Sequence, residues 1–184
     1  MLTLYSLLLP LLIPVVIVHL LLRGLKNPDY FRRWGERFGF SRIYPASPVI
    51  WIHAVSVGEA RAAVPLINAL AERYPDTPIL VTTMTPTGST EVRRQLGDRV
   101  LHCYVPYDLS FAVNRFLDQV SPCLAVTLET ELWPNIFHGC KQRDIPIVVA
   151  NARMSESSMR GYLRFEKLTQ ATLNEVSLIA AQSR

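Results

Sequence analysis

The chain has 184 residues, of which 49% are hydrophobic and 18% are charged. This composition excludes a disordered chain, because it supplies enough apolar side chains to bury a sizeable core. Eight glycines and thirteen prolines are too few for a collagen-like or low-complexity sequence. The net charge of +4 comes from one short segment, which argues against the broad basic surface of a nucleic-acid-binding protein.

Residues 1–22 contain no charged side chain. As a helix they would extend about 33 Å, which is enough to cross a hydrocarbon core of about 30 Å. A cleaved signal peptide is disfavoured, because no Lys or Arg precedes the apolar run and no Ala-x-Ala pattern follows it. We expect a membrane anchor. Pro10 and Pro14 could split the helix, so a spanning form and a form lying in the membrane interface both stay open.

Residues 23–47 form a basic segment next to the anchor. Between Arg23 and Arg42 lie six basic and two acidic residues, which accounts for the net charge of the whole chain. Positively charged segments beside an anchor stay in the cytoplasm, so we expect the body of the protein on that side. With its interleaved aromatic residues the segment would bind anionic headgroups, and a solvated linker helix is the alternative.

Three cysteines, Cys103, Cys123 and Cys140, show no metal-ligand spacing. An odd number beside a cytoplasmic address predicts buried, reduced thiols rather than a disulfide or a metal site.

Residues 48–184 alternate short apolar runs with segments of helical periodicity. Strands are expected at 49–55, 79–83, 100–105, 124–128, 145–150 and 176–181, and helices at 59–74, 90–96, 110–120, 135–143 and 157–173. Continuous apolar strands between helices predict an α/β fold with a doubly wound, Rossmann-like parallel sheet. The chain ends just after the sixth predicted strand, so we expect the front half of a longer protein.

Ligands bind beyond the carboxyl ends of the strands in such a sheet, so the residues after each strand are the candidates for function. After the first strand, Ser56 and Gly58 would form a tight turn, and Glu59 would open the next helix. An acidic residue there is favoured by the helix dipole, so a structural and a catalytic role are both open. The turn has one glycine where a dinucleotide site needs several, so no NAD or FAD cofactor is expected.

The loop after the second strand is rich in hydroxyl groups. Thr85, Thr87, Gly88 and Ser89 could present hydroxyls and backbone amides to a phosphate or a sugar, or Thr87 or Ser89 could simply cap the following helix. After the third strand, Asp108 is expected to cap the next helix.

Two carboxylates, Glu129 and Glu131, follow the fourth strand. Burying both without partners would be costly, so we expect them to line an open cleft. A carboxylate partly withdrawn from water has a raised pKa and is a better base. After the fifth strand, Arg153 could pair with an anionic substrate or equally with Glu129 or Glu131.

Taken together, these segments resemble one family. The ordered motifs are Arg33-Trp34-Gly35-Glu36-Arg37, Ser56-Val57-Gly58-Glu59, Thr82 to Ser89, Pro106-Tyr107-Asp108, Glu129 to Asn135, Asn151-Ala152-Arg153 and Leu178 to Gln182. Their order and spacing are similar to the N-terminal half of the 3-deoxy-D-manno-octulosonic acid (Kdo) transferases of Gram-negative bacteria.

The resemblance implies an inverting, metal-independent glycosyltransferase of lipopolysaccharide biosynthesis with a GT-B fold. The N-terminal domain of this fold would bind a lipid A precursor at the cytoplasmic face of the inner membrane, held there by anionic lipids. A C-terminal domain, absent from this sequence, would bind the donor CMP-Kdo, so this chain alone would be inactive.

By motif match, Glu59 would be the general base and Glu129 would support the cationic transition state, whereas Glu131 is assigned no separate role. The expected substrate contacts are Ser56, Gly58, Thr85, Thr87, Gly88, Ser89, Glu131 and Arg153. Neither a metal nor a cofactor is expected. Two alternatives stay open: a non-catalytic membrane-anchored module that binds a phosphorylated glycolipid, and another inverting GT-B glycosyltransferase.

Overall fold

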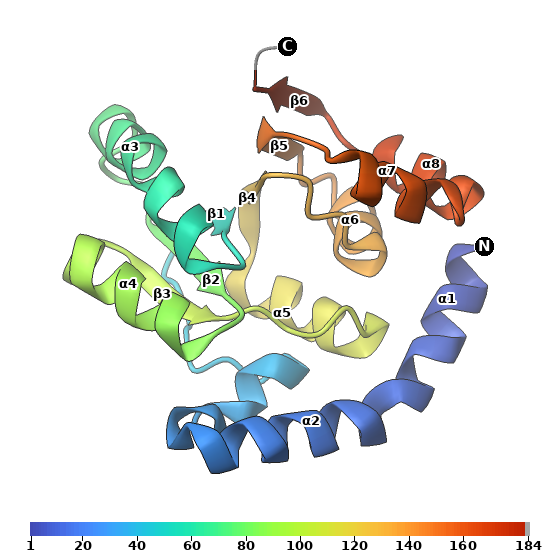
Figure 1. Ribbon diagram of the computed structural model, residues 1–184. Coiled ribbons are helices and arrows are strands. Elements are labelled where there is room, and N and C mark those ends of the chain that lie inside the picture. Colours follow the sequence, from blue (N-terminus) through green and yellow to red (C-terminus); the bar gives the residue numbers. More distant parts are fainter. Residues whose placement is uncertain (183–184) are drawn as a thin grey trace.

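The computed structural model describes residues 1–182, and these contain one six-stranded sheet (Figure 1). The strands are β1 Val49–His53, β2 Ile79–Thr83, β3 Leu101–Tyr104, β4 Pro122–Leu128, β5 Ile147–Ala152 and β6 Leu178–Ala181. All neighbouring pairs are parallel, and the order is β3-β2-β1-β4-β5-β6. The order reverses around β1, so the prediction of a doubly wound α/β fold is confirmed.

Helices cover both faces of this sheet, which explains the continuous apolar runs of its strands. On one face lie α3 Val57–Arg73 and α4 Pro86–Leu96, and on the other lie α5 Ser110–Val120 and α6 Pro134–Lys141 (Figure 1). Two hydrophobic cores result: Ile52, Ile67 and Val92 belong to the first, whereas Trp51 and Phe116 belong to the second. Alternate residues of β1 therefore point into opposite cores.

The helix expected at 157–173 is divided into α7 Glu156–Leu163 and α8 Glu166–Leu173. At the junction Phe165 leaves the helical conformation, with φ −120° and ψ 39°. Tyr162, just before the break, donates a hydrogen bond of 2.8 Å to the carbonyl of Thr130. This contact fixes α7 near the end of β4, while α8 turns to pack against α6.

The N-terminal apolar segment is an arc of α1 Leu2–Leu8, the 3-10 helix η1 Leu9–Leu12 and α2 Ile13–Lys26. It is one helical stretch long and apolar enough to cross a membrane, judged by length and composition. The bend falls at η1, because Pro10 and Pro14 lack the N–H groups that a continuous helix needs there. The predicted split at the two prolines is thus a change of helix type within a single arc.

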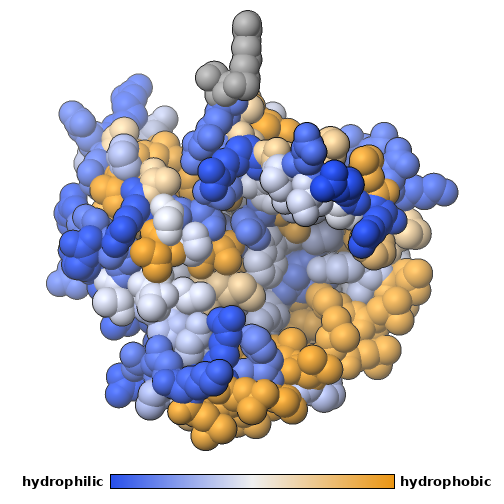
Figure 2. All heavy atoms as spheres, viewed as in Figure 1, coloured by the Kyte–Doolittle hydropathy of each residue, from blue (hydrophilic) through white to orange (hydrophobic). Residues whose placement is uncertain are grey.

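One face of the arc packs on the domain and the other is bare. On the inner face, Tyr5 and Ser6 donate hydrogen bonds to Asp108 and Asn135, and Leu20 is buried. On the outer face the exposed residues include Leu4, Leu7, Leu8, Leu11, Val15, Val18, Leu21, Leu22 and Leu25. Figure 2 shows hydrophobic atoms gathered along the lower right rim, where Figure 1 places α1 and α2.

The basic segment folds inward instead of forming a solvated linker helix. It contains two 3-10 helices, η2 Pro28–Phe31 and η3 Trp34–Phe38, and its Glu36 and Arg37 are buried. Gly39 ends η3 with φ +82°, and a Cβ atom there would lie 2.3 Å from the carbonyl oxygen of Ala112. Only glycine permits this close approach to α5.

The three cysteines are free, and Cys103 and Cys140 are buried as expected. Cys123 is exposed, so the expectation of three buried thiols was wrong there. In its strand, β4, Pro122 is buried, Cys123 is exposed, and burial is continuous only from Ala125 onward.

Candidate active site

Three carboxylates meet at the carboxyl edge of the sheet. Glu59 follows β1, whereas Glu129 and Glu131 follow β4, and these two strands are neighbours. Burial raises the pKa of Glu59, and the negative charge of Glu129 raises it further. Burial also raises the pKa of Glu131, to which the charges of Glu59 and Glu129 both add. The charge of Glu129 therefore acts on both Glu59 and Glu131, which places the three side chains at one site.

Glu59 is 5% exposed and lies in the first turn of α3. Its Oε2 accepts a 2.8 Å hydrogen bond from the backbone N–H of Val55, and its own N–H donates to the Oγ of Ser56. These bonds resemble a capping box, so the structural role considered for Glu59 is real. They also lower its pKa, but burial outweighs them and the net shift is upward. Glu59 thus combines a position fixed by two hydrogen bonds with a raised pKa.

Gly58 does not make the tight turn predicted for it. It is the second residue of α3, and a Cβ atom there would meet only the Oγ of Ser56, at an ordinary 3.8 Å. Ser56 is the N-cap residue that starts the helix.

Glu129 has a left-handed backbone, with φ +57°. This conformation is unusual for a residue with a Cβ atom and costs conformational free energy. Arg153 Nη2 lies 3.5 Å from Glu129 Oε1, and both side chains keep contact with solvent. Of the three partners considered for Arg153, Glu129 is thus the one that the structure provides.

A hydrogen bond from Trp133, whose ring packs on His53, orients Glu131. Its Oε2 accepts a 3.0 Å hydrogen bond from Nε1 of Trp133, and Trp133 packs edge-to-face against His53 with ring centroids 5.4 Å apart. His53 is fully buried, which lowers its pKa to about 3 and keeps it neutral. Its Nδ1 lies 3.0 Å from Oγ1 of Thr82, so β2 supports the orientation of Glu131 through two rings.

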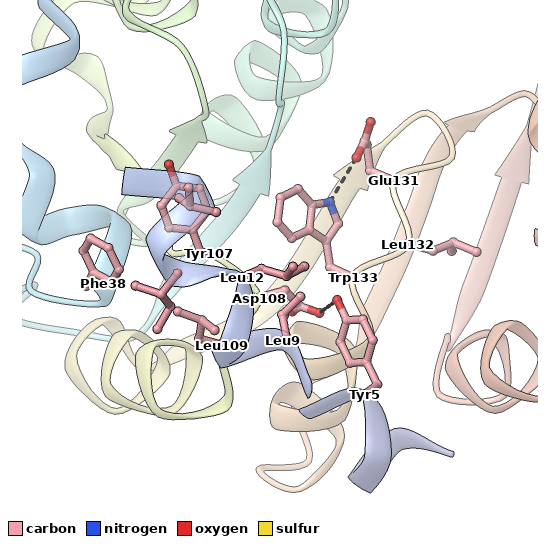
Figure 3. A pocket seen from close by; sticks show the side chains of 12 residues that line it. Tyr5, Leu9, Leu12, Phe38, Tyr107, Asp108, Leu109, Glu131, Leu132 and Trp133 are labelled. Atoms are coloured by element: carbon pink, nitrogen blue, oxygen red, sulfur yellow. Dashed lines mark hydrogen bonds between the residues drawn. The ribbon is translucent and has the colours of Figure 1, made fainter. Parts of the chain in front are cut away.

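A cavity of about 350 Å³ lies beside Glu131 and Trp133 (Figure 3). Its other walls come from the loop after β3 and from the N-terminal arc, including Leu9, Leu12 and Tyr107. The view in Figure 3 shows the Tyr5–Asp108 and Trp133–Glu131 hydrogen bonds on its two sides. The cavity thus joins the apolar arc to the carboxylate edge.

The loop after β2 starts α4, and its cap is Thr85, whose Oγ1 accepts from the N–H of Gly88. The cap is therefore neither Thr87 nor Ser89. Thr87 is exposed, whereas Ser89 is buried and accepts a 3.2 Å hydrogen bond from Arg33. A Cβ atom at Gly88 would lie 3.3 Å from the Cβ of Thr83, so glycine lets α4 start close to β2.

Asp108 caps a different helix from the one predicted. Its two carboxylate oxygens accept from the backbone N–H groups of Asn135 and Ile136, at 3.0 and 2.8 Å, at the start of α6. The N-cap residue of α5 is Leu109, which has no side-chain cap. Among residues 1–182, no cluster of three or more His, Cys, Asp or Glu side chains could hold a metal ion.

With this geometry in view, comparison with known proteins identifies the chain. The family model described as 3-deoxy-D-manno-octulosonic-acid transferase (kdotransferase) matches residues 32–184. The chain belongs to the Kdo transferase family.

Several curated relatives carry the same family name. A 3-deoxy-D-manno-octulosonic acid transferase of Haemophilus influenzae is 44% identical over 171 residues, covering 92% of this chain and 40% of the relative. A probable mitochondrial 3-deoxy-D-manno-octulosonic acid transferase of Arabidopsis thaliana is 38% identical, covering 92% of this chain and 39% of the relative. One from Rickettsia bellii is 31% identical over the whole chain and 44% of the relative. The chain spans about two fifths of the length of these Kdo transferases.

The sequence motifs shared with Kdo transferases located the carboxylates but not what holds them. Glu59, Glu129, Glu131 and Arg153 come together at one edge, whereas the Thr85–Ser89 loop is used largely for capping and packing. Sequence reasoning missed the supporting residues His53 and Trp133. The signal that was available for both is their position, at the end of a strand and within the motif that follows β4.

Proposed function

We propose that the full-length protein transfers Kdo from CMP-Kdo to a lipid A precursor, and that this chain is the acceptor-binding half with the catalytic base Glu59. The observation that carries the proposal is the group of carboxylates Glu59, Glu129 and Glu131, of which Glu131 lines a cavity whose far wall is the apolar arc. A sugar alcohol on a lipid needs this combination of a base and an apolar approach.

The proposed chemistry follows from the positions of the carboxylates. Glu59 takes the proton of the attacking hydroxyl, and the resulting alkoxide-like oxygen bonds to the anomeric carbon of Kdo. The bond from that carbon to the phosphate of CMP breaks, and CMP leaves with the electron pair. A positioned base contributes about 10²- to 10⁴-fold to such a step. The anomeric carbon becomes cationic on the way, and Glu129 stabilises that charge through space.

Expected substrate contacts differ in how freely they can reach a ligand. Arg153 and Thr87 are exposed near the carboxyl edge and are available to an acceptor or donor group. Ser56 and Gly58 are also exposed, at the start of α3, where Ser56 caps the helix. Gly88 and Ser89 are buried in the packing of α4, so their contribution would be mainly through backbone amides and the helix start.

We further propose that the arc lies in the interface of the inner membrane, on the cytoplasmic side, instead of spanning it. The inner face of the arc is bound to the domain through Tyr5, Ser6 and Leu20, and a spanning helix would have to give up these contacts. Only the outer face is apolar and bare, which is the pattern of an in-plane helix. Anionic lipids would then meet the exposed Arg23, Lys26 and Arg32.

The test of the reaction is a transfer assay with the full-length protein, CMP-Kdo and a lipid A precursor. Glu59→Gln should lower the rate by about 10²-fold or more, because the base is lost while the side chain keeps its size. Glu72→Gln, an exposed change on the same helix, is the matched control and should leave the rate unchanged. A Glu59→Gln enzyme with near wild-type rates would refute the assignment of the base.

The test of the membrane arrangement uses one thiol at the start of the arc. In a Thr3→Cys, Cys123→Ser protein, a membrane-impermeant thiol reagent should label residue 3 only from the side on which the domain lies. Labelling from the opposite side would mean that the arc spans the bilayer.

A further inference from the structure

A second pocket lies next to the first along the arc, on the side of the basic segment. Its volume is about 390 Å³, and it shares Val16 and Tyr107 with the cavity at Glu131. It opens between α2, the basic segment and the start of α4. The two pockets therefore form successive compartments along one apolar wall.

The polar wall of this pocket contains two arginines and no carboxylate among the described residues. Its lining includes Arg23, Arg37, Tyr30, Tyr107 and Thr85. Arg23 Nη1 donates a 3.0 Å hydrogen bond to the hydroxyl of Tyr30, which holds this exposed cation at the rim. Thr85 begins α4, so the positive end of that helix dipole adds to the field at the pocket.

Arg37 is a buried charge that forms no salt bridge within residues 1–182. It is 1% exposed; Nη1 donates to the carbonyl of Met84 at 2.9 Å, but Nε and Nη2 have no hydrogen-bond partner within residues 1–182. The ring of Tyr104 lies 4.3 Å from its guanidinium carbon, which offsets only part of the cost of burying this charge.

The nearest carboxylate in sequence cannot neutralise Arg37. Glu36 accepts from Nε of Arg33 at 2.8 Å through one oxygen and from the backbone N–H of Tyr104 at 2.8 Å through the other. Glu36, the acidic residue of the motif at residues 33–37, therefore pairs with Arg33. The Nε and Nη2 atoms of Arg37 are left without a hydrogen-bond acceptor within residues 1–182.

The hydroxyl of Tyr107 lies near both arginines. Burial raises the pKa of Tyr107, while the charges of Arg37 and Arg23 act in the opposite direction. An inner cation, a phenol and an outer cation therefore surround one small volume.

The opposite wall is apolar and belongs to the arc. Val15, Val16 and Leu20 line the pocket from α2, the segment whose outer face is bare. A ligand in this pocket would have an anionic group against the arginines and an apolar part along the arc. Two guanidinium donors and a phenol match the several acceptor oxygens of a phosphate group.

We propose that this pocket binds the phosphate group of a membrane lipid, with Arg37 as the inner cation and Arg23 as the outer one. The inference deepens the proposed function, because the lipid held here would be the acceptor whose sugar reaches the carboxylates through the neighbouring cavity. The phosphate supplies the missing counter-charge of Arg37, and the acyl chains remain at the apolar rim.

The test is calorimetric titration of the full-length protein, in a neutral detergent, with dihexanoyl phosphatidic acid. Wild type should bind this lipid and should not bind dihexanoyl phosphatidylcholine at the same concentrations. Arg23→Gln should weaken binding about tenfold and Arg37→Met about thirtyfold or more, since hydrogen bonds to charged groups are the stronger class. Lys141→Gln, an exposed change on α6 outside the pocket, should alter affinity by less than about twofold.

Several results would overturn the proposal. These are wild-type affinity in a folded Arg37→Met protein, equal losses in Arg23→Gln and Lys141→Gln, or equal binding of the phosphatidylcholine. Inorganic phosphate that binds as tightly as the lipid would show a site for free phosphate instead. If Arg37→Met does not fold, Arg23→Gln and Tyr107→Phe decide the matter in the same titration.

The titration contains no sugar nucleotide, so it is independent of the transfer reaction. Normal lipid binding in a protein that transfers no Kdo would contradict the proposed function alone. Normal transfer in a protein that ignores the lipid phosphate would contradict this pocket alone.

Discussion

The hydroxyl of Tyr5 donates a 2.9 Å hydrogen bond to Oδ2 of Asp108, which joins the N-terminal arc to the residue that caps α6. The two residues are 103 positions apart in the chain. Through Asp108 the arc is coupled to the helix that follows the carboxylate motif, so the apolar arc and the carboxylate edge of the sheet are joined by one buried polar residue.

Loss of this bond should loosen the arc. In Tyr5→Phe we expect amide hydrogen exchange in α1 to quicken by about five- to tenfold, because a hydrogen bond contributes about 1–1.5 kcal/mol to the closed state. Tyr44→Phe, at a residue that is 79% exposed, is the control and should leave exchange in α1 unchanged. Unchanged exchange in Tyr5→Phe would show that apolar packing alone holds the arc.

The contribution of Asp108 to stability should fall as the pH rises from about 4 to about 7. Burial raises the pKa of Asp108 from 3.8 to about 7, so the folded protein keeps a proton there that the unfolded chain releases. At this group folding takes up a proton in that window, whereas His53 and His102, whose pKa values burial lowers to about 3, act in the opposite direction. The contribution of Asp108 is therefore measured against Asp108→Asn, and the melting temperature of wild type minus that of the mutant should be larger at pH 5 than at pH 7.5. Parallel wild-type and mutant profiles would contradict the expectation.

The acid side of the pH–rate profile should report Glu59. Because the pKa of Glu59 is raised above its ordinary 4.5, kcat/KM should begin to fall at a pH above that value as the base becomes protonated. Glu129→Gln removes a negative charge that helps to raise this pKa, so the acid limb should move to lower pH while the rate itself drops. An acid limb that stays in place in the Glu129→Gln enzyme would show that the two carboxylates do not interact.

Replacing Glu129 by glycine should raise the free energy of unfolding and lower the rate of transfer. Its φ of +57° costs a residue with a Cβ atom about 1 kcal/mol, and Glu129→Gly should recover about that much free energy of unfolding. The salt bridge to Arg153 is largely exposed and adds little. Transfer by the full-length enzyme should nevertheless fall about a hundredfold, since the carboxylate near the cationic centre is gone. A glycine variant that is less stable than wild type would contradict the account of strain.

Two glycines should respond in opposite ways to alanine. Gly39→Ala would place a Cβ atom 2.3 Å from the backbone of Ala112 at a φ of +82°, so we expect a loss of about 2 kcal/mol or more. Gly161→Ala meets no atom within 4 Å inside α7, and we expect a gain of about 0.5–1 kcal/mol. Chemical denaturation of both variants measures the difference, and equal effects would contradict this view of η3.

The local sequence pattern was sufficient to predict the strands of the sheet and several of the helices that cover it. The predicted ranges 79–83 and 110–120 are the observed bounds of β2 and α5, because apolar runs and helical spacing depend on nearby residues. The carboxylates Glu59, Glu129 and Glu131 could also be found, since the carboxyl ends of parallel strands share one edge.

Features made by distant parts of the chain could not be predicted this way. Asp108 caps α6 and not the adjacent α5, because the loop after β3 happens to lie against the start of α6. Arg37 is buried against Tyr104 and Met84, residues far from it in sequence, although the local pattern predicted a basic segment that binds headgroups, with a solvated linker helix as the alternative. The roles of His53 and Trp133 likewise depend on contacts between separate strands.

The bend at η1 makes the apolar arc follow the edge of the sheet at which the carboxylates stand. If the arc lies in the membrane interface as proposed, it would hold the domain at one fixed height and so set the distance between the acyl chains and the carboxylates. Sugars that sit too deep among the headgroups, or that protrude too far into the water, would miss the base even if their chemistry were suitable. Selection by height would thus come before any recognition of the sugar itself.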